Sequence, residues 1–167
     1  IVFSAREHLF KDYLSRGLKN IIYLEWYYIP WLHKFREVSD VKRKITFIGT
    51  KSKRREKILG SINENYNIEI WGSGWSNTTL KNKTNVVIKN EVLNQKDFTE
   101  VISNSLINLN ILTIENQDVT NLKIFEITSC GGFILTEDNL KSRELLNNYG
   151  FFYNEKKTEF VERFARE

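Results

Sequence analysis

Residues 120–136 read Thr120-Asn-Leu-Lys-Ile-Phe-Glu-Ile-Thr-Ser-Cys-Gly-Gly-Phe-Ile-Leu-Thr136, and this stretch decides the fold. Its pattern predicts a helix, a double-glycine turn and a short buried strand. Lys123 falls in the first turn of the helix, where the helix dipole disfavours a cation. Glu126 lies between two large apolar residues, where burial of its charge would be costly. The two charges indicate a site for a ligand that carries a phosphate and hydroxyl groups.

From residue 44 onward the chain alternates short apolar runs with helical patterns. Such an alternation predicts an α/β fold: a Rossmann-like parallel sheet with helices on both faces. Ligands of such sheets bind at the carboxyl ends of the strands. The predicted strands are Lys44–Ile48, Asn67–Trp71, Asn85–Lys89, Ile107–Leu112, Phe133–Thr136 and Phe151–Tyr153, and the predicted helices are Lys53–Asn63, Gln95–Ser105, Asn121–Cys130, Leu140–Asn147 and Thr158–Arg166.

The first forty residues have a different pattern. A strand at Ile1–Phe3, a short helix that ends at Gly17, and a strand at Asn20–Tyr28 are expected. A domain boundary is expected near Val41, which separates residues 1–41 from a Rossmann-like domain at residues 42–167. The chain contains no methionine, even at position 1, so we expect a piece of a longer protein.

Composition places the chain among globular proteins, with 41% hydrophobic and 28% charged residues in 167. No apolar run approaches the roughly 20 residues of a membrane span, and no secretory signal opens the chain. The lone cysteine, Cys130, excludes an internal disulfide and a cysteine-cluster metal site, and it fits a reducing compartment. We therefore expect a cytoplasmic protein, with the inner membrane surface as an alternative.

The first candidate site is the turn from Gly49 to Arg55. A strand ends in glycine, Ser52 can cap the next helix, and cations crowd its first turn. Backbone amides there, together with Lys51, Arg54 and Arg55, would hold a phosphate. The alternative is a solvated basic helix face, which is common for a run of like charges.

The second candidate is the turn at the end of the next predicted strand. Gly72 and Gly74 would let a ligand approach the backbone closely. Trp75 would either stack on a base or sugar, or cover the core.

The third candidate is the segment from Asp118 to Glu126, which contains a helix start. Thr120 or Asn121 can cap the helix, which leaves amides directed at an anion, and Lys123 adds charge. The Glu126 carboxylate accepts two hydrogen bonds side by side, which suits a ribose diol. The alternative is an exposed glutamate paired with a lysine three residues earlier.

Other reactive side chains give weaker signals. Cys130 is expected to be a small packed residue at a helix end rather than a nucleophile. The only histidines, His8 and His33, make no metal site with a clear carboxylate pattern, so no metal is expected. The net charge of +4 leaves nucleic-acid binding as a third functional alternative, but no recognition motif or stacking platform supports it, and no nucleic-acid partner is expected.

Three motifs in order resemble the CgeB-type (spore-maturation) glycosyltransferases. Residues 122–136 resemble the Arg-x-Phe-Glu-x-x-x-Cys-Gly-x-x-x-Leu-Thr signature of that family, with Lys123 in place of the usual arginine. Phe47–Arg55 and Ile70–Trp75 resemble the opening motifs of the family's carboxyl-terminal domain. The resemblance extends from Lys44 to Arg163.

The resemblance implies the donor-binding half of a two-domain glycosyltransferase-B fold at residues 42–167, with residues 1–41 as the tail of the amino-terminal domain and its linker. Glu126 would hold the ribose hydroxyls, and Lys123 with the Arg54 and Arg55 pair would neutralise the diphosphate. The base pocket would be lined largely by backbone from Asn90 to Leu93. The donor-binding residues thus expected are Gly49, Lys51, Arg54, Arg55, Gly72, Gly74, Trp75, Asn90, Val92, Thr120, Asn121, Leu122, Lys123 and Glu126. Asp118, eight positions before Glu126, would face the donor sugar as the catalytic acid of the wider group.

The implied reaction is transfer of a sugar from a nucleoside-diphosphate donor, with retention, without a tightly bound metal or other cofactor. The implied partners are the nucleotide sugar, a glycan, lipid or protein acceptor, and the amino-terminal domain of the same protein. The alternative is a non-catalytic nucleotide- or glycan-binding module with the same fold.

Overall fold

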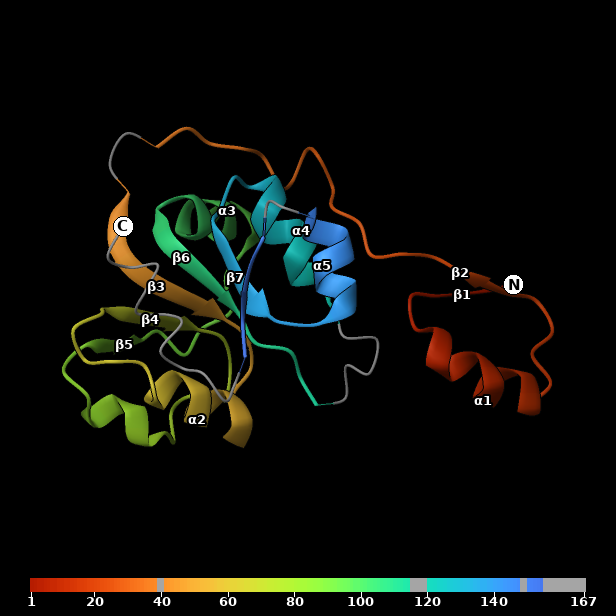
Figure 1. Cartoon of the computed structure of the whole chain (residues 1–167), viewed down its shortest axis with the longest axis horizontal. Helices are drawn as coiled ribbons and strands as arrows, with labels where there is room; N and C mark the ends of the chain where they lie inside the picture. The colour runs from red at the N-terminus through yellow and green to blue at the C-terminus, as the bar shows by residue number, and fades with distance from the viewer. Residues whose placement is uncertain (39–40, 115–119, 148–149, 155–167) are drawn as a thin grey trace.

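A six-stranded, wholly parallel sheet forms the centre of the molecule, in the order β5-β4-β3-β6-β7-β8 (Figure 1). The computed structural model describes residues 1–38, 41–114, 120–147 and 150–154. The strands are β3 (Lys42–Ile48), β4 (Ile68–Trp71), β5 (Val86–Ile88), β6 (Ser105–Asn110), β7 (Ile134–Glu137) and β8 (Phe151–Tyr153).

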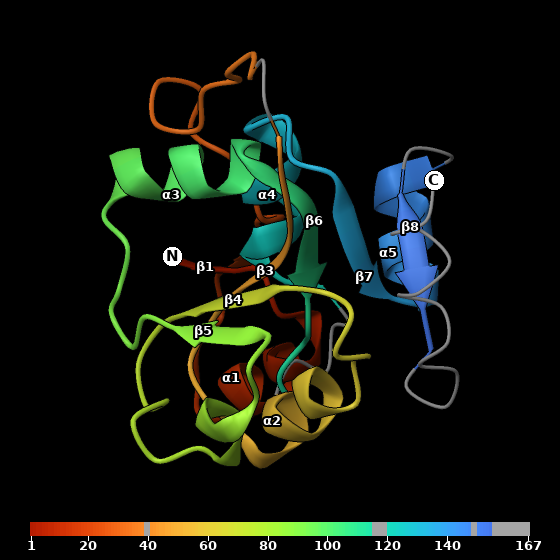
Figure 2. The same cartoon turned by 90° about the vertical axis from the view of Figure 1, so that its left-hand side faces the viewer.

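Helices cover both faces of this sheet (Figure 2). Successive strand residues point to opposite faces, and β7 shows the effect. Leu135 packs in the cluster on the α2 face, and its neighbour Ile134 packs in the cluster on the α4 face. One face carries α2 (Lys53–Gly60) and the 3₁₀ helix η2 (Thr79–Asn82), and the other carries α3 (Gln95–Ser103), α4 (Leu122–Ser129) and α5 (Leu140–Leu146).

The α/β prediction is confirmed for the part of the chain that the structure describes. Every strand predicted from residue 44 onward is present, with ends that differ by up to two residues. The short helix η2 was not predicted. The helix expected at Thr158–Arg166 lies outside the described residues.

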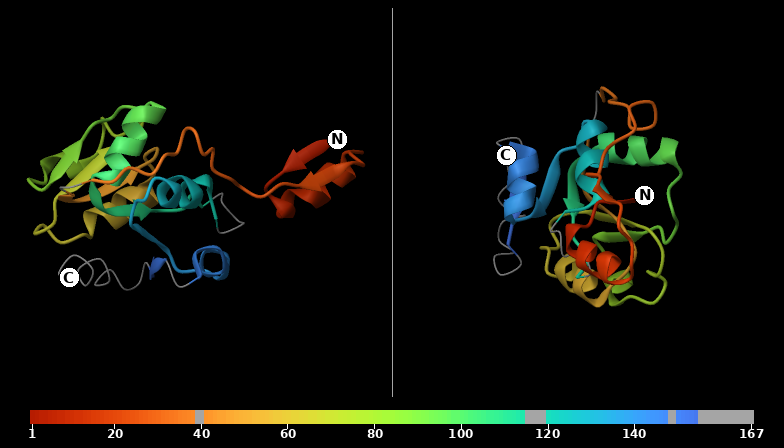
Figure 3. Two further views of the ribbon diagram at one scale, coloured as in Figure 1. Left: turned by 90° about the horizontal axis from the view of Figure 1, so that it is seen from above. Right: turned by 90° about the vertical axis from the view of Figure 1, so that its right-hand side faces the viewer.

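The amino-terminal residues form a small separate unit that extends from one side of the sheet (Figure 3). Its two strands pair in parallel as a second sheet. Gly17 ends the helix between them with a positive φ of 86°, as expected. The elements are β1 (Val2–Ser4), the 3₁₀ helix η1 (Glu7–Leu9), α1 (Phe10–Ser15) and β2 (Ile21–Tyr23).

The predicted strand Asn20–Tyr28 is wrong beyond Tyr23. Residues 24–36 instead form an extended connection, here called the strap, which returns along α3 and α4 to the sheet (Figure 1). The hydroxyl of Thr99 in α3 donates to the carbonyl of Leu32 at 3.3 Å. Of the aromatic residues between positions 26 and 31, Tyr27, Tyr28 and Trp31 are exposed, and Trp26 is partly buried.

The turns after β3 and β4 touch each other closely. The amide of Gly49 donates to the carbonyl of Trp71 at 2.9 Å. Gly72 has a φ of 125°, and a Cβ atom there would lie 2.4 Å from the carbonyl oxygen of Gly49. Only glycine satisfies both the backbone conformation and the contact, so Gly72 serves the close approach of two backbones.

Gly72→Ala is expected to lower the free energy of unfolding by about 2–4 kcal/mol, because it combines a disallowed conformation with a clash against backbone. Gly17→Ala is the matched control. Its φ is also positive, but a Cβ atom added there would meet nothing within 4 Å, so it should cost only about 1–2 kcal/mol. Urea unfolding of both variants measures the difference, and equal losses would contradict the proposed clash.

Candidate functional site

The carboxyl ends of β3, β4, β6 and β7 meet at one edge of the sheet, because parallel strands end at the same side. In Figure 1 the arrowhead of β3 points toward the side on which the amino-terminal unit lies. The first turns of α2 and α4 lie at the same edge. All three candidate segments of the sequence are therefore brought to one side of the molecule.

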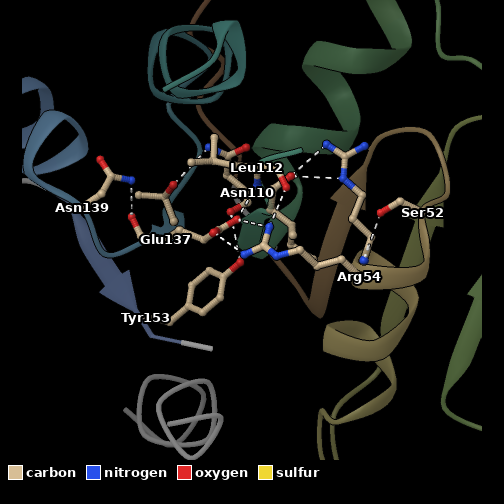
Figure 4. A network of polar contacts seen from close by, with 10 residues as sticks. Ser52, Arg54, Asn110, Leu112, Glu137, Asn139 and Tyr153 are labelled. Carbon is tan, nitrogen blue, oxygen red and sulfur yellow. Dashed lines mark hydrogen bonds and ion pairs between the residues drawn. The ribbon is translucent and has the colours of Figure 1, made fainter. Parts of the chain in front are cut away.

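Arg54 connects three elements at this edge (Figure 4). Its guanidinium donates to the Leu112 carbonyl at 2.7 Å and to both carboxylate oxygens of Glu137, at 3.0 and 2.5 Å. Glu137 also accepts from the Leu112 amide at 2.5 Å. The charge expected to bind a diphosphate is thus balanced by a carboxylate of β7, and a phosphate group would compete with Glu137 for it.

Arg55 is directed into the protein, which does not favour the direct donor contact predicted for it. Its side chain is buried, and it donates to the Ile111 carbonyl at 2.8 and 3.2 Å and to the Thr50 carbonyl at 2.9 Å. The guanidinium also lies over the Phe47 ring. A buried cation requires such partners, and here it ties the end of β3 to the end of β6.

Trp75 is likewise a core residue, with 1% of its surface exposed. Its indole nitrogen donates to the Gly49 carbonyl at 2.8 Å, and its ring meets Phe47 edge to face. Its backbone amide donates to the side chain of Asn90 at 2.7 Å. The core interpretation is confirmed, the stacking interpretation is wrong, and Asn90 acts on this turn through its side chain.

Lys51 is engaged within the protein as well. Its amine lies 3.2 Å from a carboxylate oxygen of Glu56 and donates to the Asn77 carbonyl. Glu56 also accepts from Thr78 and from the Thr79 amide. Hydrogen bonding from Thr78 lowers the pKa of Glu56, aided by Thr79 and Lys51 and opposed by burial.

Two other predicted residues lie near these turns. Gly74 has a φ of 84° and packs beside the Cβ of Lys51. Val92 is 80% exposed and lines an open groove of about 490 Å³ formed by β3, β4, the segment after β5 and α3. The polar groups of that groove satisfy one another: Lys44 and the indole of Trp71 both donate to Glu69, at 2.6 and 2.7 Å.

The start of α4 differs from the other sheet-covering helices. Ser52, Asn94 and Asn139 cap α2, α3 and α5 with their side chains. Asn121 occupies the corresponding position of α4, but its side chain exchanges hydrogen bonds with Asn110 at 3.2 and 3.0 Å instead.

The expected capping of this helix by the side chain of Thr120 or Asn121 is therefore absent, and the first amides of α4 have no side-chain cap from the residues with described positions. Thr120, just before it, is buried, and its hydroxyl has no hydrogen-bond partner among the described residues. The predicted catalytic residue Asp118 lies outside the described part of the chain.

Glu126 lies in the second turn of α4 and is only 12% exposed, so it is not the solvated glutamate of the alternative interpretation. One carboxylate oxygen accepts from Lys123 at 2.6 Å, and the other lies 3.5 Å from Nε2 of His33. The Lys123 amine also rests 4.4 Å from the centre of the Phe98 ring. Lys123 and Glu126 thus form the ion pair of the alternative interpretation, although Glu126 is not exposed, and a histidine of the strap lies beside them.

A cavity of about 250 Å³ opens beside Glu126. Sequence reasoning missed its strap residues, because only the fold brings them to α4. The run of aromatic residues between positions 23 and 31 is the one signal in the sequence that points to this segment. The cavity is lined by Trp26, Tyr27, Ile29, Leu32, His33, Gln95, Leu122 and Glu126.

Cys130 is fully buried, and burial raises the pKa of its thiol, which confirms a packed residue rather than a nucleophile. No three metal-binding side chains gather among the residues that have described positions. Within the same residues, no helix has the length and apolar character needed to span a bilayer.

Glu56→Gln is expected to lower stability at pH 7 by about 1 kcal/mol, because the charged acceptor of several hydrogen bonds is lost. A lowered folded-state pKa stabilises the protein above the ordinary value of 4.5, and this stabilisation is lost as the pH falls further. The gap between wild type and variant should therefore shrink below pH 4.5.

Thermal unfolding across this acid range measures the gap. Glu64→Gln is the control, since 70% of that side chain is exposed, and it should leave the pH profile unchanged. A gap for Glu56→Gln that stays constant down to low pH would contradict the assignment.

The fold is shared with a glycosyltransferase of solved structure. The T4 phage protein BGT, solved as a mutant in complex with UDP-glucose, matches 93% of this chain with a TM-score of 0.60 and 16% identity. This chain spans 49% of the phage protein. A "glycotransferase of kitacinnamycin" matches 80% of the chain and 37% of its own, with a TM-score of 0.45 and 9% identity.

No curated protein matches the sequence. The sequence model of one family, described as glycosyl transferase-like, matches residues 42–166. That range contains the whole six-stranded sheet, the Arg54 network and Glu126. The chain belongs to the glycosyl transferase-like family.

Proposed function

We propose that this chain is the donor-binding half of a CgeB-type, two-domain glycosyltransferase, and that it binds a nucleoside-diphosphate sugar at the carboxyl edge of the sheet. The observation that carries the proposal is the position of Glu126. Its carboxylate is largely buried in the second turn of α4, accepts a hydrogen bond from Lys123 and lines a cavity. A carboxylate in such a place suits a diol, which offers it two hydroxyl donors.

The diphosphate would lie at the start of α4. Asn121 leaves the amides there uncapped, and the helix dipole favours an anion. Lys123 lies in the first turn, and its amine donates a hydrogen bond to Glu126. A bound phosphate would accept a second hydrogen bond from the same amine. These groups would stabilise the charge that develops on the leaving diphosphate, without a metal and with retention at the sugar. Asp118 is proposed to face the donor sugar.

The remaining parts of the proposal concern the whole protein. Residues 1–41 would be the end of an amino-terminal domain and the linker that joins it to the donor domain. The acceptor, a glycan, lipid or protein, would bind mainly to that amino-terminal domain. The protein would act in the cytoplasm.

Calorimetric titration with UDP-glucose and with GDP-, ADP- and TDP-sugars tests the proposal. Glu126→Gln should weaken binding about 10- to 100-fold, since a charged hydrogen bond contributes about 1.5–3 kcal/mol. Glu144→Gln, which changes an exposed glutamate of α5, is the matched control and should bind like wild type.

If no nucleotide sugar binds to this chain or to the longer protein, the proposal fails. If binding is present but Glu126→Gln leaves it unchanged, the role of Glu126 fails. Donor hydrolysis or sugar transfer by the longer protein separates an enzyme from a non-catalytic binding module with the same fold.

A further inference from the structure

Three buried side-chain nitrogens lack a hydrogen-bond partner within the described part of the chain: Nε1 of Trp26, Nε2 of His33 and Nε2 of Gln95. All three residues line the cavity beside Glu126. A buried donor left unsatisfied costs about 1–3 kcal/mol, and such groups are rare in folded proteins. They are concentrated around one cavity, where the acceptor atoms of a bound molecule would satisfy them.

The chemistry of these donors is well defined. An indole nitrogen only donates. Nδ1 of His33 accepts from the Ile29 amide at 2.9 Å, so in the neutral ring the proton is on Nε2, which is the atom that faces Glu126. The Gln95 amide carries both a donor and an acceptor and can turn to present either one. The cavity therefore offers at least two fixed donors, one adaptable amide and the Glu126 carboxylate.

The shape and polarity of the cavity further restrict the type of ligand that fits it. Its other walls are apolar or aromatic, from Tyr27, Ile29, Leu32 and Leu122. Its volume of about 250 Å³ lies below the roughly 300–1,000 Å³ of pockets for drug-sized ligands, which favours a single ring over a fused pair. The Glu126 charge disfavours an anion in this place. A flat, neutral ring with carbonyl oxygens fits these conditions.

We propose that Trp26 and His33 of the strap, with Gln95 of α3, form a nucleobase subsite that selects a uracil-type base, in place of the base pocket expected from Asn90 to Leu93. This inference rests on the proposed function, since it takes the ligand to be a nucleotide whose ribose reaches Glu126. Two ring carbonyls would accept from the buried N–H donors. Cytosine has an amino group in place of one carbonyl, so a hydrogen-bond donor of the base would face a donor of the protein. Adenine has no carbonyl to accept a hydrogen bond.

Calorimetric titration with UDP, CDP and ADP tests the selectivity on the chain with its strap. UDP should bind at least tenfold more tightly than CDP or ADP, because a site built to hydrogen-bond a group rejects an analogue that leaves its buried donors unpaired. Equal affinities for the three nucleotides would overturn the inference.

Trp26→Phe tests the indole donor, since it keeps an aromatic wall and removes the N–H. UDP should bind about three- to tenfold more weakly, the effect of one hydrogen bond, and the preference over ADP should fall by the same factor. Trp31→Phe is the matched control: Trp31 belongs to the same strap, is 73% exposed and does not line the cavity, so it should change neither value.

Gln95→Leu is the second variant, independent of the strap, and it should reduce UDP affinity in the same way. If both variants keep wild-type affinity and selectivity while Glu126→Gln loses affinity, the subsite is a water-filled cavity only, and the proposed function survives without it. If no nucleotide binds at all, the proposed function fails together with this inference.

Discussion

The burial of one guanidinium organises the functional edge of this sheet. Arg55 follows directly on the turn after β3, and its guanidinium reaches carbonyls that follow β3 and β6. Because a buried cation without such acceptors would be strongly destabilising, the two strand ends must remain where they supply them. The Phe47 ring packs against the Arg55 guanidinium and also contacts the Trp75 ring edge to face. Through these hydrogen bonds Arg55 links α2, the turn after β3 and the segment after β6.

The neighbouring residues Arg54 and Arg55 show which features of the site could be predicted from the sequence and which could not. Their position at a helix start beside a sheet edge followed from the strand–glycine–helix pattern. Their roles did not, since successive residues of a helix point about 100° apart. That rotation sends one guanidinium to Glu137 and the other into the core. Local pattern therefore predicted most elements of the domain, the parallel arrangement of its strands and the edge that carries the site, but not the direction of each side chain.

The surroundings of Glu126 show a second kind of contact that a sequence pattern does not predict. Its pairing with Lys123 is a matter of helical spacing and could be predicted. Its contact with His33 depends on the path of the strap across α3 and α4, which no local pattern encodes. The aromatic residues of the strap were misinterpreted as a strand for the same reason. Long-range contacts of irregular segments arise from tertiary packing alone, and the cavity is built from one such segment.

The strap has a thermodynamic consequence. It joins the amino-terminal unit to the sheet and also forms a wall of the cavity beside Glu126. A molecule that binds this cavity only when the strap is docked must stabilise docking by the same factor by which docking strengthens its binding. The orientation of the amino-terminal unit and the occupancy of the cavity are then coupled equilibria, with His33 at the junction between them.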